Sequence, residues 1–193
     1  GNFGDGSVYY FDDIIQDGND DVIACEDPGT GGGVDPNSIV FPVDFECEFI
    51  ENYIAVDFEG TFTQVIDNPF AEGINTSPKV AQTVKGNGAA TFAGTIINLA
   101  EPIDFNISKV FTMKVRSPKA GIIVKMKLEQ TGNGAIANEK DVFTTVADQW
   151  EELTFDFSDT DASNAKMQQS IVIFFDFGVP GDGASYFFDD IVQ

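Results

Sequence analysis

The sequence predicts an all-β protein, a two-sheet antiparallel β-sandwich of the jelly-roll type. Apolar residues recur at every second position over most of the chain, turn-forming residues interrupt them at regular intervals, and the 193 residues include 19 Phe and 19 Gly. Phe, Val, Ile and Thr favour strands, whereas Gly, Asp, Asn and Pro favour turns. Many short alternating strands joined by regular turns are typical of sandwiches and jelly rolls.

The clearest strands have one apolar and one polar face. They cover residues 111–116, 122–129 and 152–157. Their period of two predicts half-buried strands, with one face on a core and the other in solvent. Turn residues separate the strands at 67–69, 86–88, 117–118, 132–134 and 180–183. A helical pattern is confined to a short turn near residues 161–169.

The two ends of the chain repeat one another. Residues 4–16 (GDGSVYYFDDIIQ) and 181–193 (GDGASYFFDDIVQ) are identical at nine of thirteen positions, and a repeat usually marks one structural unit. We therefore expect residues 1–16 to be the closing strand of a preceding module, 17–38 a Gly/Asp-rich linker and 39–193 one complete module. The alternative is a single domain whose first and last strands look alike. As an orphaned strand, the first segment is expected to pack on this module or to add to a neighbouring molecule.

The charge balance excludes several function classes. With 10 basic and 32 acidic residues and no histidine, the net charge is −22, so the chain lacks the basic surface that nucleic acids need and is repelled by anionic membranes. Histidine-dependent triads and zinc sites are impossible, and two cysteines cannot form a Cys₄ site. No apolar run is long enough to span a membrane. The chain starts without a basic, apolar leader, so any secretion signal is expected to lie outside this sequence.

The two cysteines allow two interpretations. Cys25 lies in the predicted linker and Cys47 in the first strand of the module. In an exported protein a Cys25–Cys47 disulfide would tie the linker to the sandwich. The alternation of Phe45, Cys47 and Phe49 points Cys47 inward, which favours a buried free thiol. We expect the free thiol.

Several stretches of 39–193 carry a family resemblance. They are FPVDFE (41–46), NP (68–69), INTSPKVAQTVKGNGAATFAG (74–94), IDFNISKVFTMKVRSPKAG (103–121), VKMKLE (124–129), TTVADQWEELTFDFS (144–158) and IVIFFDFGVPGDGASYFFDDI (171–191). In this order and spacing they resemble the carbohydrate-binding-module-like jelly rolls, of family 4/9 type with a galactose-binding-like sandwich, of multimodular surface glycan-binding proteins and glycoside hydrolases. The resemblance implies a non-catalytic module that captures polysaccharide, with neighbouring modules of the same chain, in a secreted or cell-surface protein. A neutral β-glucan such as laminarin is the ligand that it favours.

Two other functions stay open. One is a structural spacer or protein-interaction module without a sugar site. The other is a polysaccharide-cleaving enzyme, since glycoside hydrolysis needs only two carboxylates at about 5–9.5 Å. None of the acids lies in a recognisable catalytic motif, and a lyase would want a Tyr or His base with a neutralising Arg or Asn, whereas Arg116 is the single arginine and histidine is absent. We expect no enzyme activity.

Trp150, the single tryptophan, is the first candidate for sugar binding. It shares the polar face of its strand with Glu152, Thr154 and Asp156. Aromatic rings stack on the apolar faces of sugars while neighbouring polar groups bind the hydroxyls, so we expect Trp150 to be a stacking platform. The alternative is that Trp150 plugs the rim of the sandwich.

Two further strands carry candidates. Lys125, Lys127 and Glu129 form a charged row on one strand face and would bind vicinal hydroxyls; the alternative is a solvated face. Phe174 and Asp176 share a face of another strand, where Phe174 would be a second platform.

We expect one shallow groove lined by Trp150, Lys127, Glu129 and Asp176. It requires Trp150 and Lys127 to lie on the same face of the sandwich. Phe92 and Tyr53 are the candidates if the site lies on edge loops instead.

The closing strand also suggests a metal. Asp189 and Asp190 interrupt an aromatic strand, so one carboxylate points inward and needs a partner or a cation. The family resemblance implies a calcium ion between the first and last strands, held by carboxylates of both and by main-chain carbonyls. We therefore expect one structural Ca²⁺ at Glu46 and Asp190, with Asp189 as a further candidate. The acidic run 17–21 lacks the spacing of a calcium loop and is expected to be a solvated linker.

Overall fold

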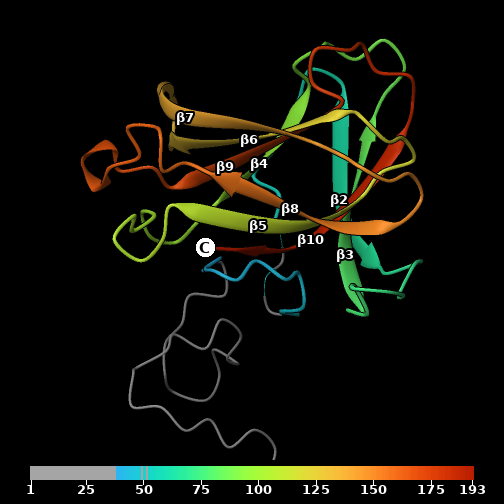
Figure 1. Ribbon diagram of the computed structural model, residues 1–193, viewed down its shortest axis with the longest axis horizontal. Helices are drawn as coiled ribbons and strands as arrows, with labels where there is room; N and C mark the ends of the chain where they lie inside the picture. Colours follow the sequence, from blue (N-terminus) through green and yellow to red (C-terminus); the bar gives the residue numbers. More distant parts are fainter. Residues whose placement is uncertain (1–37, 49, 51) are drawn as a thin grey trace, which may run out of the picture.

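The computed structural model describes residues 38–193 apart from 49 and 51, and this part of the chain forms two antiparallel five-stranded sheets (Figure 1). The first sheet has the order β1 (Val56–Phe58), β4 (Gly94–Asn98), β9 (Ser170–Phe175), β6 (Ile123–Gln130) and β7 (Asn133–Phe143). The second has the order β2 (Thr61–Asp67), β3 (Lys79–Lys85), β10 (Ser185–Val192), β5 (Val110–Arg116) and β8 (Trp150–Asp156). The predicted two-sheet sandwich is confirmed.

The predicted local structure agrees closely with these elements. The three clearest alternating segments correspond to β5, β6 and β8, with ends that differ by one or two residues. The short helical turn is also found, as the 3₁₀ helix η2 (Asn164–Lys166). Among the described residues, no helix is long and apolar enough to cross a membrane.

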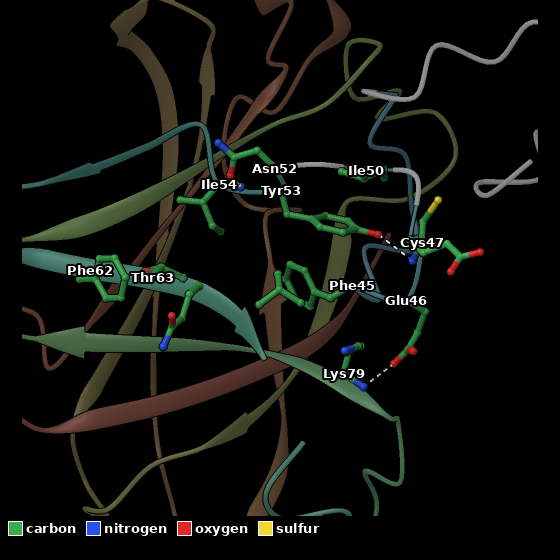
Figure 2. A pocket seen from close by; sticks show the side chains of 13 residues that line it. Phe45, Glu46, Cys47, Ile50, Asn52, Tyr53, Ile54, Phe62, Thr63 and Lys79 are labelled. Carbon is green, nitrogen blue, oxygen red and sulfur yellow. Dashed lines mark hydrogen bonds between the residues drawn. The ribbon is translucent and has the colours of Figure 1, made fainter. Parts of the chain in front are cut away.

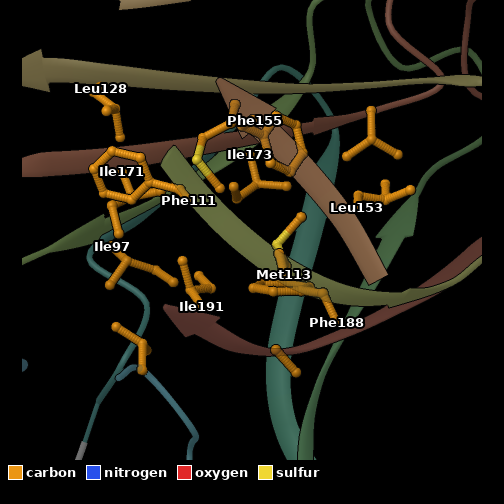
Figure 3. Close-up of a cluster of buried hydrophobic side chains, with 14 of the residues drawn as sticks. Ile97, Phe111, Met113, Leu128, Leu153, Phe155, Ile171, Ile173, Phe188 and Ile191 are labelled. Atoms are coloured by element: carbon orange, nitrogen blue, oxygen red, sulfur yellow. The ribbon is translucent and has the colours of Figure 1, made fainter. Parts of the chain in front are cut away.

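The core lies between the two sheets and explains the high phenylalanine content. Figure 3 shows side chains of both sheets meeting there, among them Phe111 and Phe155 from the second sheet and Ile171 and Ile173 from the first. Aromatic rings contact one another at the angles that their charge distribution favours: Phe111 and Phe157 meet at 88° with centroids 5.7 Å apart. One continuous aromatic and aliphatic layer therefore holds the sheets together.

The closing strand β10 lies in the middle of the second sheet, between β3 and β5. The opening segment runs beside it, because Val43 and Ile191 form an antiparallel bridge with hydrogen bonds of 2.9 and 3.0 Å. The opening segment therefore lies beside the closing strand as expected, but it does so through this isolated bridge and not as a strand, since the first strand of the described residues is β1. The repeat of this strand in residues 1–16, the acidic run 17–21 and all but the last residue of the predicted linker lie outside the described residues, so the module boundaries stay predictions.

Deletion of a core side chain tests this packing. Leu153 lies on the inner face of β8 and is buried, so Leu153→Ala should lower the free energy of unfolding by about 2–5 kcal/mol. Ile107, which is 73% exposed, is the control, and Ile107→Ala should change it by less than about 0.5 kcal/mol. Denaturant unfolding measures both, and equal losses would contradict the assigned core.

Candidate functional site

The outer face of the first sheet carries aligned rows of side chains. The central row crosses all five strands, through Glu139, Lys127, Val172, Ile96 and Val56. Paired residues of neighbouring antiparallel strands project to the same side of a sheet, and alternate residues project to the other side. Since Met126 and Leu128 of β6 point into the core, this row points outward.

A groove of about 290 Å³ lies along this face. All five strands contribute to its lining, from Phe58 of β1 to Glu139 of β7. The lining residues are Phe58, Phe92, Ile96, Lys125, Lys127, Glu129, Glu139, Val172, Phe174 and Phe177. The groove therefore has an aromatic part and a charged part side by side.

The aromatic part is a cluster of phenylalanines around Phe174. Its ring meets Phe58 and Phe177 edge to face, with centroids 5.8 and 5.5 Å apart. Gly94 makes this packing possible, because a Cβ there would lie 2.9 Å from Phe174 Cδ1 and 3.0 Å from Phe58 Cζ. Phe92 adds a ring that is 50% exposed.

The charged part contains two lysines with different surroundings. Lys125 Nζ lies 2.8 Å from Glu139 Oε2, 3.0 Å from Asp141 Oδ1 and 4.3 Å from the centroid of the Phe177 ring. Burial lowers the pKa of Lys125, but its hydrogen bonds to these two carboxylates more than offset this, and the net shift is upward. Lys125 is therefore a fixed, neutralised part of the groove floor.

Lys127 pairs with Glu129, the residue two positions further on the same face of β6. Their Nζ and Oε2 atoms are 2.8 Å apart. The backbone of β7 lies against this pair, since a Cβ at Gly134 would be 2.9 Å from Glu129 Oε2 and 3.1 Å from Lys127 Nζ. Beside the pair, Glu129 is in register with Ser170, whose hydroxyl donates to Asn98 Oδ1 at 2.7 Å. Ser170 is buried, so the Lys127 ammonium and the Glu129 carboxylate are the donor and the acceptor at this end of the groove.

The structure brings together four of the predicted binding residues and separates two. Lys125, Lys127, Glu129 and Phe174 all line the groove. Trp150 does not, and the predicted common groove is wrong in this respect, because β8 belongs to the second sheet. The alternation assigned Trp150 to an outward face, but an alternation does not tell to which of two sheets a strand belongs.

Trp150 instead belongs to a small cluster on the far face of the sandwich. It packs with Val80 and Phe187, is 8% exposed, and donates a 2.8 Å hydrogen bond from Nε1 to the carbonyl of Phe70. Arg116 stacks on the Phe70 ring at 3.6 Å. The structural interpretation of Trp150 is therefore the one that the contacts support.

Asp176 is the second correction. It directly follows β9, where a φ of 48° interrupts the strand alternation. Its carboxylate turns to Lys119, with Nζ 3.1 Å from Oδ2, and does not line the groove. Tyr53, the edge-loop candidate, is buried and its hydroxyl accepts a hydrogen bond from the Cys47 amide at 3.0 Å (Figure 2).

Sequence analysis missed several residues that line the groove. Phe58 comes from a strand of only three residues, and Phe177 lies in a turn, so neither belongs to a clear alternating pattern. Ile96 and Val172 look like core residues, because their strands are apolar on both faces. Glu139 lies in a strand with weak alternation, and only its register with Lys127 identifies it.

Cys47 is disulfide-bonded, so the predicted free thiol is wrong. The predicted inward orientation is correct, since Cys47 is buried. Burial does not distinguish a thiol from a disulfide, which is why the pattern could not decide. Cys25, the other cysteine of the sequence, lies outside the described residues.

The sequence predicts that one carboxylate of the closing strand is buried, and of the two it is Asp189. It is fully buried, and it accepts hydrogen bonds from Asn75 Nδ2 at 2.9 Å and from the Asp190 amide at 2.8 Å. Burial, and then the charge of Asp190, raise its pKa to about 7. Asp189 therefore has polar partners within the chain, and its role as a calcium ligand stays a prediction.

Glu46 and Asp190 fit a calcium ion in their donor chemistry. Burial raises the pKa of Glu46, and the negative charges of Asp44 and Asp190 raise it further, a repulsion that a cation would relieve. Both also have partners: Glu46 Oε1 accepts from the Lys79 amide at 2.9 Å (Figure 2), and Asp190 Oδ2 lies 2.5 Å from Lys114 Nζ. The described residues contain no group of three or more metal-ligating side chains, so main-chain carbonyls or water would have to complete a site. The calcium site stays a prediction.

Chelation tests the calcium prediction. An ion at Glu46 and Asp190 would tie the opening segment to β10, so EDTA should lower the melting temperature by several degrees, and added Ca²⁺ should restore it. Glu46→Gln is the matched variant and should show a smaller response to both treatments. An unchanged melting temperature of the wild type in EDTA would remove the calcium site.

No protein-family model matches the sequence, and a search of curated proteins finds no match. Among solved structures, the CBM22-2 xylan-binding domain of Paenibacillus barcinonensis Xyn10C has a TM-score of 0.51 and 13% identity over 78% of this chain and 96% of that one. An exo-β-agarase has a TM-score of 0.56 and 10% identity over 78% and 24%. The CBM22-1–GH10 modules of Clostridium thermocellum xylanase 10B have a TM-score of 0.47 and 15% identity over 79% and 27%.

These comparisons concern the fold. The predicted likeness to the jelly rolls of carbohydrate-binding modules is confirmed, whereas nothing among these structures supports the family 4/9 type. The chain spans only about a quarter of the length of the agarase and xylanase chains that it matches.

Proposed function

We propose that the groove on the first sheet binds a neutral polysaccharide without cleaving it, with a β-glucan such as laminarin as the first ligand to test. The observation that carries this proposal is the combination, in one open groove across five strands, of the Phe174 aromatic cluster with the Lys127–Glu129 ion pair. The module would capture polysaccharide for a degradation system at the cell surface or outside the cell, next to other modules of its chain.

The chemistry of the groove suits a sugar because sugars are amphipathic. Their apolar C–H faces stack on aromatic rings, for which Phe92 is the exposed platform. Their hydroxyls both donate and accept, which matches the Lys127 ammonium and the Glu129 carboxylate. Five strands spaced by about 4.8 Å give a face roughly 19 Å wide, enough for several sugar units of an extended chain.

The charges of the groove favour a neutral ligand. Its two lysines are matched by Glu129, Glu139 and Asp141, so the local formal charge is 2 − 3 = −1. The whole chain carries −22. A polyanion such as alginate would be repelled by both.

The ion pairs of the three carboxylates support the proposal of binding without catalysis. Each of the three lies within 3.0 Å of a lysine ammonium. A lyase would need a cation to neutralise its substrate, whereas Lys125 and Lys127 are each paired with carboxylates. Arg116 stacks on Phe70 at the far face of the sandwich. The groove is therefore suited to hold a sugar chain without proton transfer to it.

Affinity electrophoresis tests this function. The protein should be retarded in gels that contain laminarin or another neutral glucan, and not in alginate. Phe92→Ala removes an exposed stacking ring and should weaken binding by about 1 kcal/mol, roughly fivefold. Lys127→Met removes an ammonium that would donate a hydrogen bond to a sugar hydroxyl, and it should weaken binding by a similar factor.

Trp150→Phe is the matched control, because it removes the indole hydrogen bond to the Phe70 carbonyl on the outer face of the second sheet. It should lower stability and leave the affinity unchanged. No retardation in any gel would favour the spacer or protein-interaction module. A loss of affinity in Trp150→Phe alone would move the site to the second sheet.

A further inference from the structure

Lys85, the last residue of β3, is a lysine buried inside the sandwich. It is 1% exposed, and its Nζ donates to three main-chain carbonyls: Asp176 O at 2.9 Å, Phe175 O at 3.1 Å and Thr91 O at 3.4 Å. Burial lowers the pKa of Lys85, and the carboxylates of Asp176 and Asp182 partly offset this. Removing an ammonium group from water costs free energy. The hydrogen bonds to the three carbonyls offset part of that cost.

The three carbonyls belong to two of the three segments that carry the groove aromatics, the third being β1 with Phe58. Thr91 directly precedes Phe92, and Phe175 and Asp176 lie between Phe174 and Phe177. A single ammonium group from the second sheet thus joins the two chain segments that carry Phe92, Phe174 and Phe177 in the groove on the first sheet. The amide of Gly178 adds a 2.9 Å hydrogen bond to Thr91 O between the same segments.

The surroundings of Lys85 hold it in this position. A Cβ at Gly181 would lie 2.1 Å from Gly86 O and 3.0 Å from Lys85 Cγ, so only glycine allows the chain to close over the lysine stem. On the outer side, Lys119 Nζ bridges Asp176 Oδ2 at 3.1 Å and Asp182 Oδ2 at 2.7 Å. Asp176 is therefore held from inside by its carbonyl and from outside by its carboxylate.

We infer that Lys85 is a positioning residue: its buried ammonium fixes the 91–92 and 174–177 segments relative to each other and thereby sets the aromatic part of the groove. It is buried and is not among the residues that line the groove. The importance of this role for affinity rests on the proposed function, whereas the role in positioning does not.

A reporter in the groove tests the positioning directly. Trp150→Phe together with Phe92→Trp gives a protein whose single indole is at the groove rim. In this background, Lys85→Met keeps an unbranched side chain of nearly the same length and removes its charge. It should shift the emission maximum of the rim indole and increase its quenching by acrylamide by about twofold or more. Leu153→Ala, a buried change on an edge strand of the second sheet, is the control for lost stability and should leave both values unchanged.

The second measurement is the affinity for the glucan that retards the protein in the gels. It uses proteins that keep the native Trp150 and Phe92. Lys85→Met should weaken binding by about tenfold, and Leu153→Ala should not change it. If Lys85→Met does not fold, Lys85→Gln retains an N–H donor for the carbonyls and should give a smaller change in the same direction in both measurements.

The outcomes separate this inference from the proposed function. Unchanged emission and quenching in both Lys85 variants would overturn the positioning role. A changed reporter in a protein that binds no polysaccharide would support the positioning role and refute the proposed function. Equal effects of Lys85→Met and Leu153→Ala on the reporter would reduce Lys85 to a general stability residue and overturn the inference.

Discussion

The pairing of β6 with β7 and β9 is the constraint on which both the core and the groove depend. Because the side-chain period of a strand is two, the register that places Met126 and Leu128 in the core also places Lys125 and Lys127 on the outer face. A slip of one residue would bury two lysines and expose the core. Burial of the apolar inner face therefore fixes the strand register, and the register fixes the positions of the charged side chains on the outer face. The geometry of the groove thus depends on the packing of the core.

Alternation predicted the sandwich and the outward row on β6, since each depends only on the local period of a strand. It failed where tertiary structure decides. Trp150 was correctly assigned to an outward face but to the wrong sheet, because strand order comes from long-range pairing. Asp176 left its expected face because a positive φ ends the alternation directly after β9. Phe58 and Phe177 join the groove through contacts with Phe174, which no short-range pattern contains.

In this strongly acidic chain, several lysines each contact more than one carboxylate or carbonyl. Few cations are available, and the structure places several of them where they organise carboxylates or carbonyls: Lys125 between Glu139 and Asp141, Lys119 between Asp176 and Asp182, and Lys85 among main-chain carbonyls. Surface ion pairs contribute little to stability, but partly buried ones with defined geometry hold shape. In this module they shape the floor and the support of the groove.

The most direct measurement is an NMR titration of the ¹⁵N-labelled protein with oligosaccharides of a neutral β-glucan. Amide shifts should be largest along β4, β6 and β9 and in the segments around Phe92 and Phe177. The indole N–H of Trp150, which gives the single tryptophan side-chain signal, should not move. Two results would contradict a binding groove on the first sheet. One is that the largest shifts occur at this indole and at the chain around Phe70. The other is that no shift occurs with the oligosaccharides of a polymer that retards the protein.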